Sequence, residues 1–169
     1  RADFPAGYYS PDFTPAATGS KTLLLTHTSY RNPDIMDTLL EDDRILEIAA
    51  NGDLLWQWRA GDHIDELGFD DAARTSIRRI SANRSSYDWS HINSVTYVGP
   101  NQWFNNGDER FAPDNIIISS RHANFIAIIN RQGHVVWRIG PDFSASKAEQ
   151  KIRQIIGPHH VHLIPPGLP

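Results

Sequence analysis

Histidines stand at two corresponding places in the chain, each at the start of an apolar run. His91 lies in YDWSHINSVTYV and is followed two residues later by Asn93. His160 lies in GPHHVHLIP and is followed at the same spacing by His162. A single histidine before a strand is most often a hydrogen-bonded structural residue. Because a histidine recurs at the equivalent position, a functional role for these imidazoles is favoured. A purely structural role remains the alternative.

A cluster of neutral imidazoles with an arginine suits two kinds of chemistry. In the first, a ring nitrogen attacks a sulfuryl or phosphoryl group, because imidazole is the strongest neutral nucleophile in a chain without cysteine. Arg121, at the end of NIIISSR, would neutralise the transferring oxygens, and a second histidine would act as acid and base. In the second, three or four histidines bind a transition metal, as the triplet His159, His160 and His162 would allow.

The elements that must position these residues are short strands joined by turns. Strands are expected at 22–28 (TLLLTHT), 91–98 (HINSVTYV) and 115–120 (NIIISS). A first hairpin turns at Asn51-Gly52, the strongest short-range turn signal, and a second turns at 131–133.

The segments between and around these strands are expected to be irregular or helical. Residues 29–43 predict a polar loop, and 65–82 and 144–155 each predict a short helix. Residues 1–21 hold prolines and small side chains, which predicts an extended arm before a domain at 22–169. The chain starts at Arg1 and stops in PPGLP, so we expect a piece of a longer polypeptide.

The two hairpins form an internal repeat. A shift of 81 residues lays Ile45 on Ile126, Ile48 on Ile129, Gly52 on Gly133 and Trp56 on Trp137. Each hairpin follows an apolar strand, and a run beginning with histidine opens each unit. Antiparallel units of four strands are typical of β-propeller blades, so we predict an all-β propeller of which this chain supplies roughly two blades. A β-sandwich with two similar hairpins is the alternative.

Propeller geometry gives the histidines a common location. The first strand of a blade lines the central channel, and overlaying two such strands places His91 on His160 and Asn93 on His162. Alternation along a strand puts His160 and His162 on one face and His159 on the other. Arg121 would lie near the same channel mouth, and His27, at the end of an apolar strand, is a further candidate for it.

Other conspicuous residues have simpler explanations. Trp56, Trp58 and Trp137 are expected to pack between blades, and His63, His122 and His134 have no support from the repeat. His134 is expected to be exposed in its hairpin. The acidic pairs are interpreted as solvated loop charges, and none has the spacing of a calcium loop: Asp42-Asp43, Asp70-Asp71 and Asp108-Glu109.

Composition excludes several classes of protein. The chain has 169 residues, 40% hydrophobic and 21% charged, which suits one globular domain. The net charge is -4 and the basic residues are scattered, which disfavours nucleic acid as a partner. No apolar stretch approaches the length of a membrane span, and without cysteine there is neither a disulfide nor a thiol nucleophile.

Four stretches together resemble the arylsulfate sulfotransferase (ASST) family of β-propellers: DWSHINSV, ISSRHAN, GHVVWRIG and HHVHLIP. The resemblance covers about residues 43–169. It implies a six-bladed propeller that moves a sulfuryl group from a phenolic sulfate ester to another phenol. The family uses a sulfohistidine intermediate and needs neither the nucleotide donor PAPS nor any other cofactor.

The resemblance also implies roles for individual residues. His91 matches the acid/base or sulfate-binding histidine of the family, Arg121 its arginine at the strand end, and His160 its nucleophile. Around His160 the sequence departs from the bacterial pattern, in which the nucleophile stands in a Gln-His-Thr context. We assign Asn93, His162 and His27 to substrate binding, and no residue to a metal.

Two other functions remain as alternatives to sulfuryl transfer. One is a different enzyme on the same propeller, with a transition metal held by the channel histidines. The other is a non-enzymatic binding platform. The expected partners are phenolic substrates and the rest of the propeller, supplied by further sequence or by a second chain. Relatives are often exported, so a periplasmic or secreted location is expected.

Overall fold

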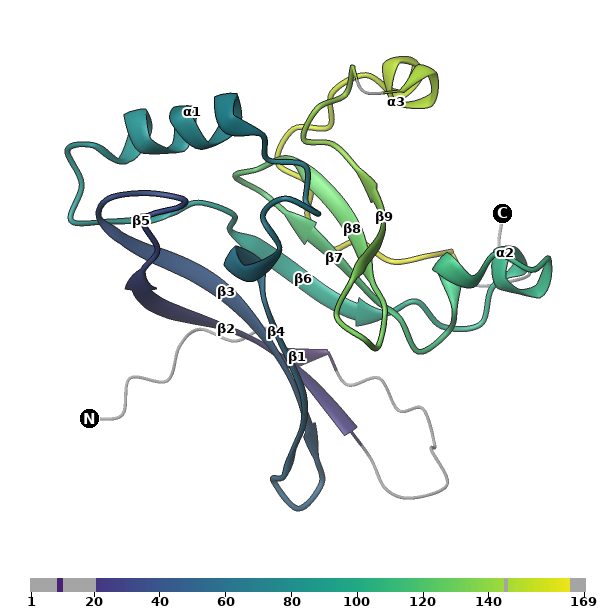
Figure 1. Cartoon of the computed structure of the whole chain (residues 1–169). Helices are drawn as coiled ribbons and strands as arrows, with labels where there is room; N and C mark the ends of the chain where they lie inside the picture. Colours follow the sequence, from purple (N-terminus) through teal and green to yellow (C-terminus); the bar gives the residue numbers. More distant parts are fainter. Residues whose placement is uncertain (1–8, 11–20, 145, 165–169) are drawn as a thin grey trace.

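The computed structural model describes residues 9–10, 21–144 and 146–164, and these form two β-sheets with a few short helices (Figure 1). The all-β class is confirmed. Of the arm predicted at 1–21, only Tyr9–Ser10 and Lys21 are described, and the rest lies outside the described residues. Within the described residues, no helix is long and apolar enough to cross a membrane.

The first sheet has the order β1-β2-β3-β4, with β5 paired in parallel to β3. The bounds of its strands are Tyr9–Ser10 (β1), Lys21–Arg31 (β2), Leu39–Ala49 (β3), Leu54–Arg59 (β4) and Ser86–Asp88 (β5). A 3₁₀ turn (η1, Ala60–His63) and a helix (α1, Asp71–Ser81) connect β4 to β5. The carboxylate of Asp70 caps this helix by accepting from the amide of Ala73.

The second sheet is a four-stranded antiparallel meander in the order β6-β7-β8-β9. Its strands are Ile92–Tyr97 (β6), Ile116–Ser120 (β7), Phe125–Ile129 (β8) and Val135–Ile139 (β9). The remaining short helices are α2 (Gln102–Asn105), η2 (Glu109–Phe111) and α3 (Lys147–Ile152). This is the strand order expected for one blade. The helices predicted within 65–82 and 144–155 are confirmed as α1 and α3, both shorter than those ranges.

The two hairpins share one register, offset by 81 residues. The equivalent pairs of Cα partners are Ile45–Trp58 and Ile126–Ile139, Glu47–Trp56 and Ile128–Trp137, and Ile48–Leu54 and Ile129–Val135. Even the register irregularity recurs, between Glu47 and Ile48 and between Ile128 and Ile129. The repeat inferred from the sequence is therefore a repeat of structure.

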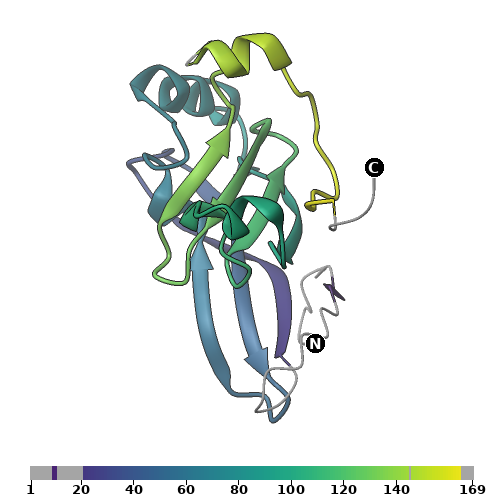
Figure 2. The ribbon, with the colours of Figure 1, turned by 90° about the vertical axis from the view of Figure 1, so that its right-hand side faces the viewer.

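One hydrophobic core is shared by residues of both sheets. Its fully buried members include Leu23, Leu25, Leu40 and Ile45 from the first sheet and Ile116, Ile118, Phe125, Ala127 and Ile129 from the second. α1 lies at the end of the sheets away from the tip of the β3–β4 hairpin, which extends beyond the second sheet (Figure 2). Adjacent propeller blades and the sheets of a sandwich both pack face to face, so the propeller stays a prediction.

Two tryptophans of β4 connect the first sheet to the second by hydrogen bonds. Trp58 is 3% exposed, and its indole N–H donates to the carbonyl of Gly133 at 3.0 Å. Trp56 donates to the carbonyl of Arg131 at 3.1 Å, on the same turn of the second hairpin.

The prediction of a polar loop at 29–43 is wrong over most of that range. β2 continues to Arg31 and β3 begins at Leu39, so the connection is only 32–38. Asp42 and Asp43, predicted to be solvated, have no exposed surface. Burial disfavours the charged carboxylate and raises the pKa of Asp42 to about 6. These acids sit inside a strand because partners from elsewhere in the chain satisfy their oxygens.

The prediction of a strand that begins at His160 is also wrong, because the described residues 157–164 form no strand. His160 has a positive φ of 57°, which interrupts an extended run. The alternation argument for the histidines at 159, 160 and 162 therefore does not apply.

Candidate functional site

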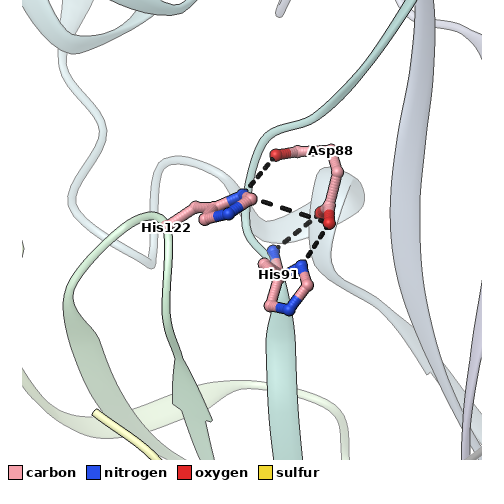
Figure 3. A group of neighbouring side chains, drawn as sticks. All are labelled: Asp88, His91 and His122. Atoms are coloured by element: carbon pink, nitrogen blue, oxygen red, sulfur yellow. Dashed lines mark hydrogen bonds and ion pairs between the residues drawn. The ribbon is translucent and has the colours of Figure 1, made fainter. Parts of the chain in front are cut away.

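Asp88 and His91 form the centre of the candidate site, in the turn between β5 and β6. The carboxylate of Asp88 uses both oxygens on His91: Oδ1 accepts from the backbone amide at 2.9 Å, and Oδ2 contacts ring Nδ1 (Figure 3). His91 has a φ of 47°, in the left-handed region that non-glycine residues rarely adopt. The hydrogen bond from the His91 amide to Asp88 therefore stabilises an unusual backbone conformation, and this conformation sets the direction of the ring.

A third residue, His122, completes this group from the end of β7. Its Nδ1 lies 2.8 Å from the backbone carbonyl of Asp88, and its ring centroid lies 4.5 Å from that of His91 (Figure 3). A carbonyl and a carboxylate only accept, so each ring carries its Nδ1 proton toward Asp88. In the neutral form, both rings then keep the lone pair on Nε2.

The internal repeat offers no support for His122, although the sequence contains another signal for it. His122 follows Arg121 directly, and β6 pairs with β7 so that Ile92 faces Ser120. Continuing this antiparallel pairing places Arg121 opposite His91 and His122 opposite Ser90, so His122 must lie close to the segment that carries His91. Asp88, three residues before His91 in DWSH, was likewise not assigned a role.

Arg121 is brought to His91 through the backbone. Its amide donates to the carbonyl of His91 at 3.0 Å, and the amide of His122 donates to the carbonyl of Ser90 at 3.2 Å. The side chain of Arg121 is exposed, and its guanidinium forms no hydrogen bond or ion pair with the residues that the structure describes. Arg121 thus brings a bidentate donor to the strand end that also carries His91.

The buried acids of β3 fix the backbone on both sides of His91. Asp43 Oδ2 accepts from the amide of Ile92 at 2.6 Å and from the hydroxyl of Ser90. Asp42 accepts from the indole N–H of Trp89 at 2.9 Å. The segment from Trp89 to Ile92 is therefore bound to the first sheet, and this explains why two carboxylates are buried in a strand.

His27 lies on β2 against the same buried acid. Its Nδ1 is 3.0 Å from Oδ1 of Asp43. The carboxylate beside it raises the pKa of His27, against the lowering effect of its partial burial. His27 is thus connected to the His91 segment through Asp43, and its side chain is 36% exposed.

Asn93, predicted to bind substrate, is hydrogen-bonded to the backbone of the segment that precedes His160. It is 3% exposed; its Nδ2 donates to the carbonyl of Pro158 at 2.8 Å, and its Oδ1 accepts from the hydroxyl of Ser119 at 2.7 Å. The next residue, Ser94, accepts from the amide of Val161 at 3.1 Å. These two bonds hold the backbone on either side of His160 against β6.

His160 and His162 lie together at the surface. Their ring centroids are 5.6 Å apart and the rings are nearly perpendicular. In the described part of the chain, no hydrogen bond, ion pair or ring contact joins either of them to His91 or Arg121. The structure thus gathers His91, His122, Arg121 and, through Asp43, His27, while His160 and His162 form a second group beside β6.

The fold and the site define an all-β protein with an imidazole–carboxylate group and an exposed arginine at the ends of paired strands. The arylsulfotransferase (ASST) family model matches residues 1–154, and the chain belongs to this family. The family implies a sulfotransferase-type enzyme, and the resemblance noted in the sequence is confirmed. No curated protein and no solved structure matches the chain.

The match to the family model covers some of the candidate residues but not all of them. It contains His27, His91, Asn93 and Arg121, whereas His160 and His162 lie beyond its end. The predicted roles of all six residues stay predictions.

Proposed function

We propose that the protein transfers a sulfuryl group from a phenolic sulfate ester to a phenol, without PAPS, through a sulfohistidine. The observation that carries this proposal is the backbone hydrogen bond that joins Arg121 to His91, whose ring is held at Nδ1 by Asp88. Membership in the arylsulfotransferase family supports it. The reaction needs a nucleophile, an acid/base and a cation, and the chain offers one candidate for each.

In the first half-reaction, a ring nitrogen of His160 attacks sulfur and the bond from sulfur to the phenolic oxygen breaks. Protonated His91 gives its proton to the departing phenolate. In the second half-reaction, neutral His91 takes the proton of the acceptor phenol, whose oxygen attacks the sulfohistidine. The bond from sulfur to nitrogen breaks, so His160 is regenerated and His91 is again protonated.

Arg121 would bind the non-bridging oxygens of the sulfuryl group in both steps. The hydrogen bond from its amide to the carbonyl of His91 fixes its backbone beside the acid/base, and its guanidinium has no hydrogen bond or ion pair among the described residues to break. A guanidinium offers parallel donors that match two oxygens, and this stabilises charge as the group transfers.

The remaining candidates would contact or position the substrate. His162 lies beside His160, and His27 is linked to the His91 segment through Asp43. The bonds from β6 to Pro158 and Val161 suggest a positioning role for Asn93, in place of direct contact with substrate. The rest of the propeller, as further sequence or a second chain, would complete the channel, and a periplasmic or secreted location remains our expectation.

The direct test is release of 4-nitrophenolate from 4-nitrophenyl sulfate with phenol as acceptor. The proposal predicts phenol-dependent release by the wild type and its loss in His91→Ala and His160→Ala. His134→Ala is the matched control, because His134 is exposed and contacts only Glu66 in the ion pairs of the described residues. Wild-type protein that releases no nitrophenolate in the presence of phenol would contradict the proposal.

A further inference from the structure

We propose that Asp88, His91 and His122 form a binding site for a divalent transition-metal ion of the zinc class. Each residue offers one ligand atom, and these atoms all lie within 4.8 Å of one another. The site is separate in chemistry from sulfuryl transfer, which needs no metal, although it shares His91 with it.

The spacing of the three groups suits a single ion. Zinc binds imidazole nitrogen and carboxylate oxygen at about 2.0–2.2 Å, so neighbouring ligand atoms of one ion are separated by roughly 3–4 Å. The separations of up to 4.8 Å between the ligand atoms in this structure are slightly wider. Both rings direct Nδ1 at Asp88, so the ion would take the place of their Nδ1 protons, and small rotations of these partly exposed rings would close the difference in spacing.

The backbones that carry the ligands are already fixed. The carboxylate of Asp88 holds the amide of His91, and hydrogen bonds from the amides of Arg121 and His122 tie the end of β7 to residues 90 and 91. Binding would therefore order little beyond the side chains. A site that is organised before the ion arrives loses less entropy on binding.

The ligand set also indicates the kind of ion. Two imidazoles and one carboxylate favour zinc, copper, iron or nickel over calcium and magnesium, which prefer oxygen alone. The side chains of Asp88, His91 and His122 are 21%, 34% and 40% exposed, so solvent reaches the site from one side. Three protein ligands with an open side leave at least one position for water or another ligand.

A second group in the chain also combines two imidazoles with one carboxylate, there a glutamate, but its geometry differs. Glu66 contacts His63 through Oε1 at 2.8 Å and His134 through Oε2 at 3.7 Å, and the ring of His63 is stacked on Trp58. The two imidazoles thus approach different oxygens of the carboxylate. This group therefore serves as a control, because it also holds two imidazoles and a carboxylate but its imidazoles contact different carboxylate oxygens.

Titration of Zn²⁺ into the full protein, with any affinity tag removed, tests the site by calorimetry. We expect saturable binding of one ion and a loss of at least about tenfold in affinity for His122→Ala and for Asp88→Asn. His134→Ala should bind as the wild type does. Circular dichroism verifies folding, and His122→Gln replaces His122→Ala if the latter unfolds.

The proposal is overturned if the wild type binds no Zn²⁺ stoichiometrically, or if removal of His122 leaves the affinity unchanged. The calorimetric titration uses no sulfate ester, so its failure is distinct from failure of the proposed transfer reaction. Because a bound ion would occupy His91, Zn²⁺ should also inhibit nitrophenolate release in the wild type but much less in Asp88→Asn relative to that variant's own rate.

Discussion

Asp88 binds His91 at two points, with one carboxylate oxygen on the backbone amide and the other on ring Nδ1. The first contact supports a positive φ at His91, and the second sets the direction of the ring. One side chain therefore determines both where the imidazole is and which nitrogen it presents. In a proposed acid/base histidine, this leaves Nε2 as the atom that exchanges protons with the phenol.

Asp88→Asn should lower kcat for sulfuryl transfer by about 10²-fold, the low end of what acid–base catalysis contributes. The asparagine oxygen can still accept from the His91 amide, so folding should persist, but the ring loses its anionic partner. KM should change little, because Asp88 is not proposed to touch substrate. Steady-state kinetics with 4-nitrophenyl sulfate measure both constants, and Asp88→Glu should recover part of the loss.

Glu66→Gln is the matched control, since it removes another contact between a carboxylate and a histidine three residues away. An Asp88→Asn enzyme with the kcat of the wild type would show that Asp88 does not position the acid/base.

Asn93→Ala should destabilise the protein by about 1–3 kcal/mol, the cost of leaving buried polar partners unsatisfied. It removes the bonds to the carbonyl of Pro158 and the hydroxyl of Ser119. Urea denaturation measures the free energy of unfolding. Limited proteolysis should also show faster cleavage near His160, because the bond that holds the preceding residues against β6 is lost.

Asn83→Ala controls for the loss of an amide, because Asn83 is exposed in the turn after α1. Equal stability of the two variants would mean that the Asn93 bonds do not hold the C-terminal segment.

His27 should make stability depend on pH with a definite sign. Its pKa is raised in the folded protein by Asp43, so folding favours the protonated ring. That stabilisation is complete below the unfolded pKa of about 6.5 and is lost as the pH rises through the folded value. His27→Asn should therefore lower the Tm more at about pH 5.5 than at about pH 8.5.

The control for this pH effect is His159→Asn, whose side chain is exposed and forms no interaction among the described residues. Thermal unfolding of His27→Asn that differs from wild type equally at both pH values would exclude the ion pair with Asp43 as the cause.

The strands and hairpins could be predicted because their signals are local. Alternating apolar residues and the Asn51-Gly52 turn define the first hairpin, and the offset of 81 residues carries the same register to the second. The burial of Asp42 and Asp43 could not be predicted in the same way. Their partners include Trp89, Ser90 and Ile92, almost 50 residues away, and only the packed fold brings these together.

The candidate site shows the same division. His91 and Arg121 were found because sequence motifs mark them, whereas His122 depends on the pairing of β6 with β7. The strand predicted at His160 was wrong because the repeat supplied a pattern but no partner strand. In its place, the side chains of Asn93 and Ser94 bind the backbone of this segment.

The central claim is that a histidine carries the sulfuryl group. Incubating the protein with 4-nitrophenyl sulfate and no acceptor, quenching at alkaline pH and mapping peptides by mass spectrometry tests it directly. We predict one sulfuryl adduct, on the peptide that contains His160, which disappears when phenol is added and is absent from His160→Ala. An adduct that persists in His160→Ala, or nitrophenolate release by the wild type without any protein adduct, would contradict the account.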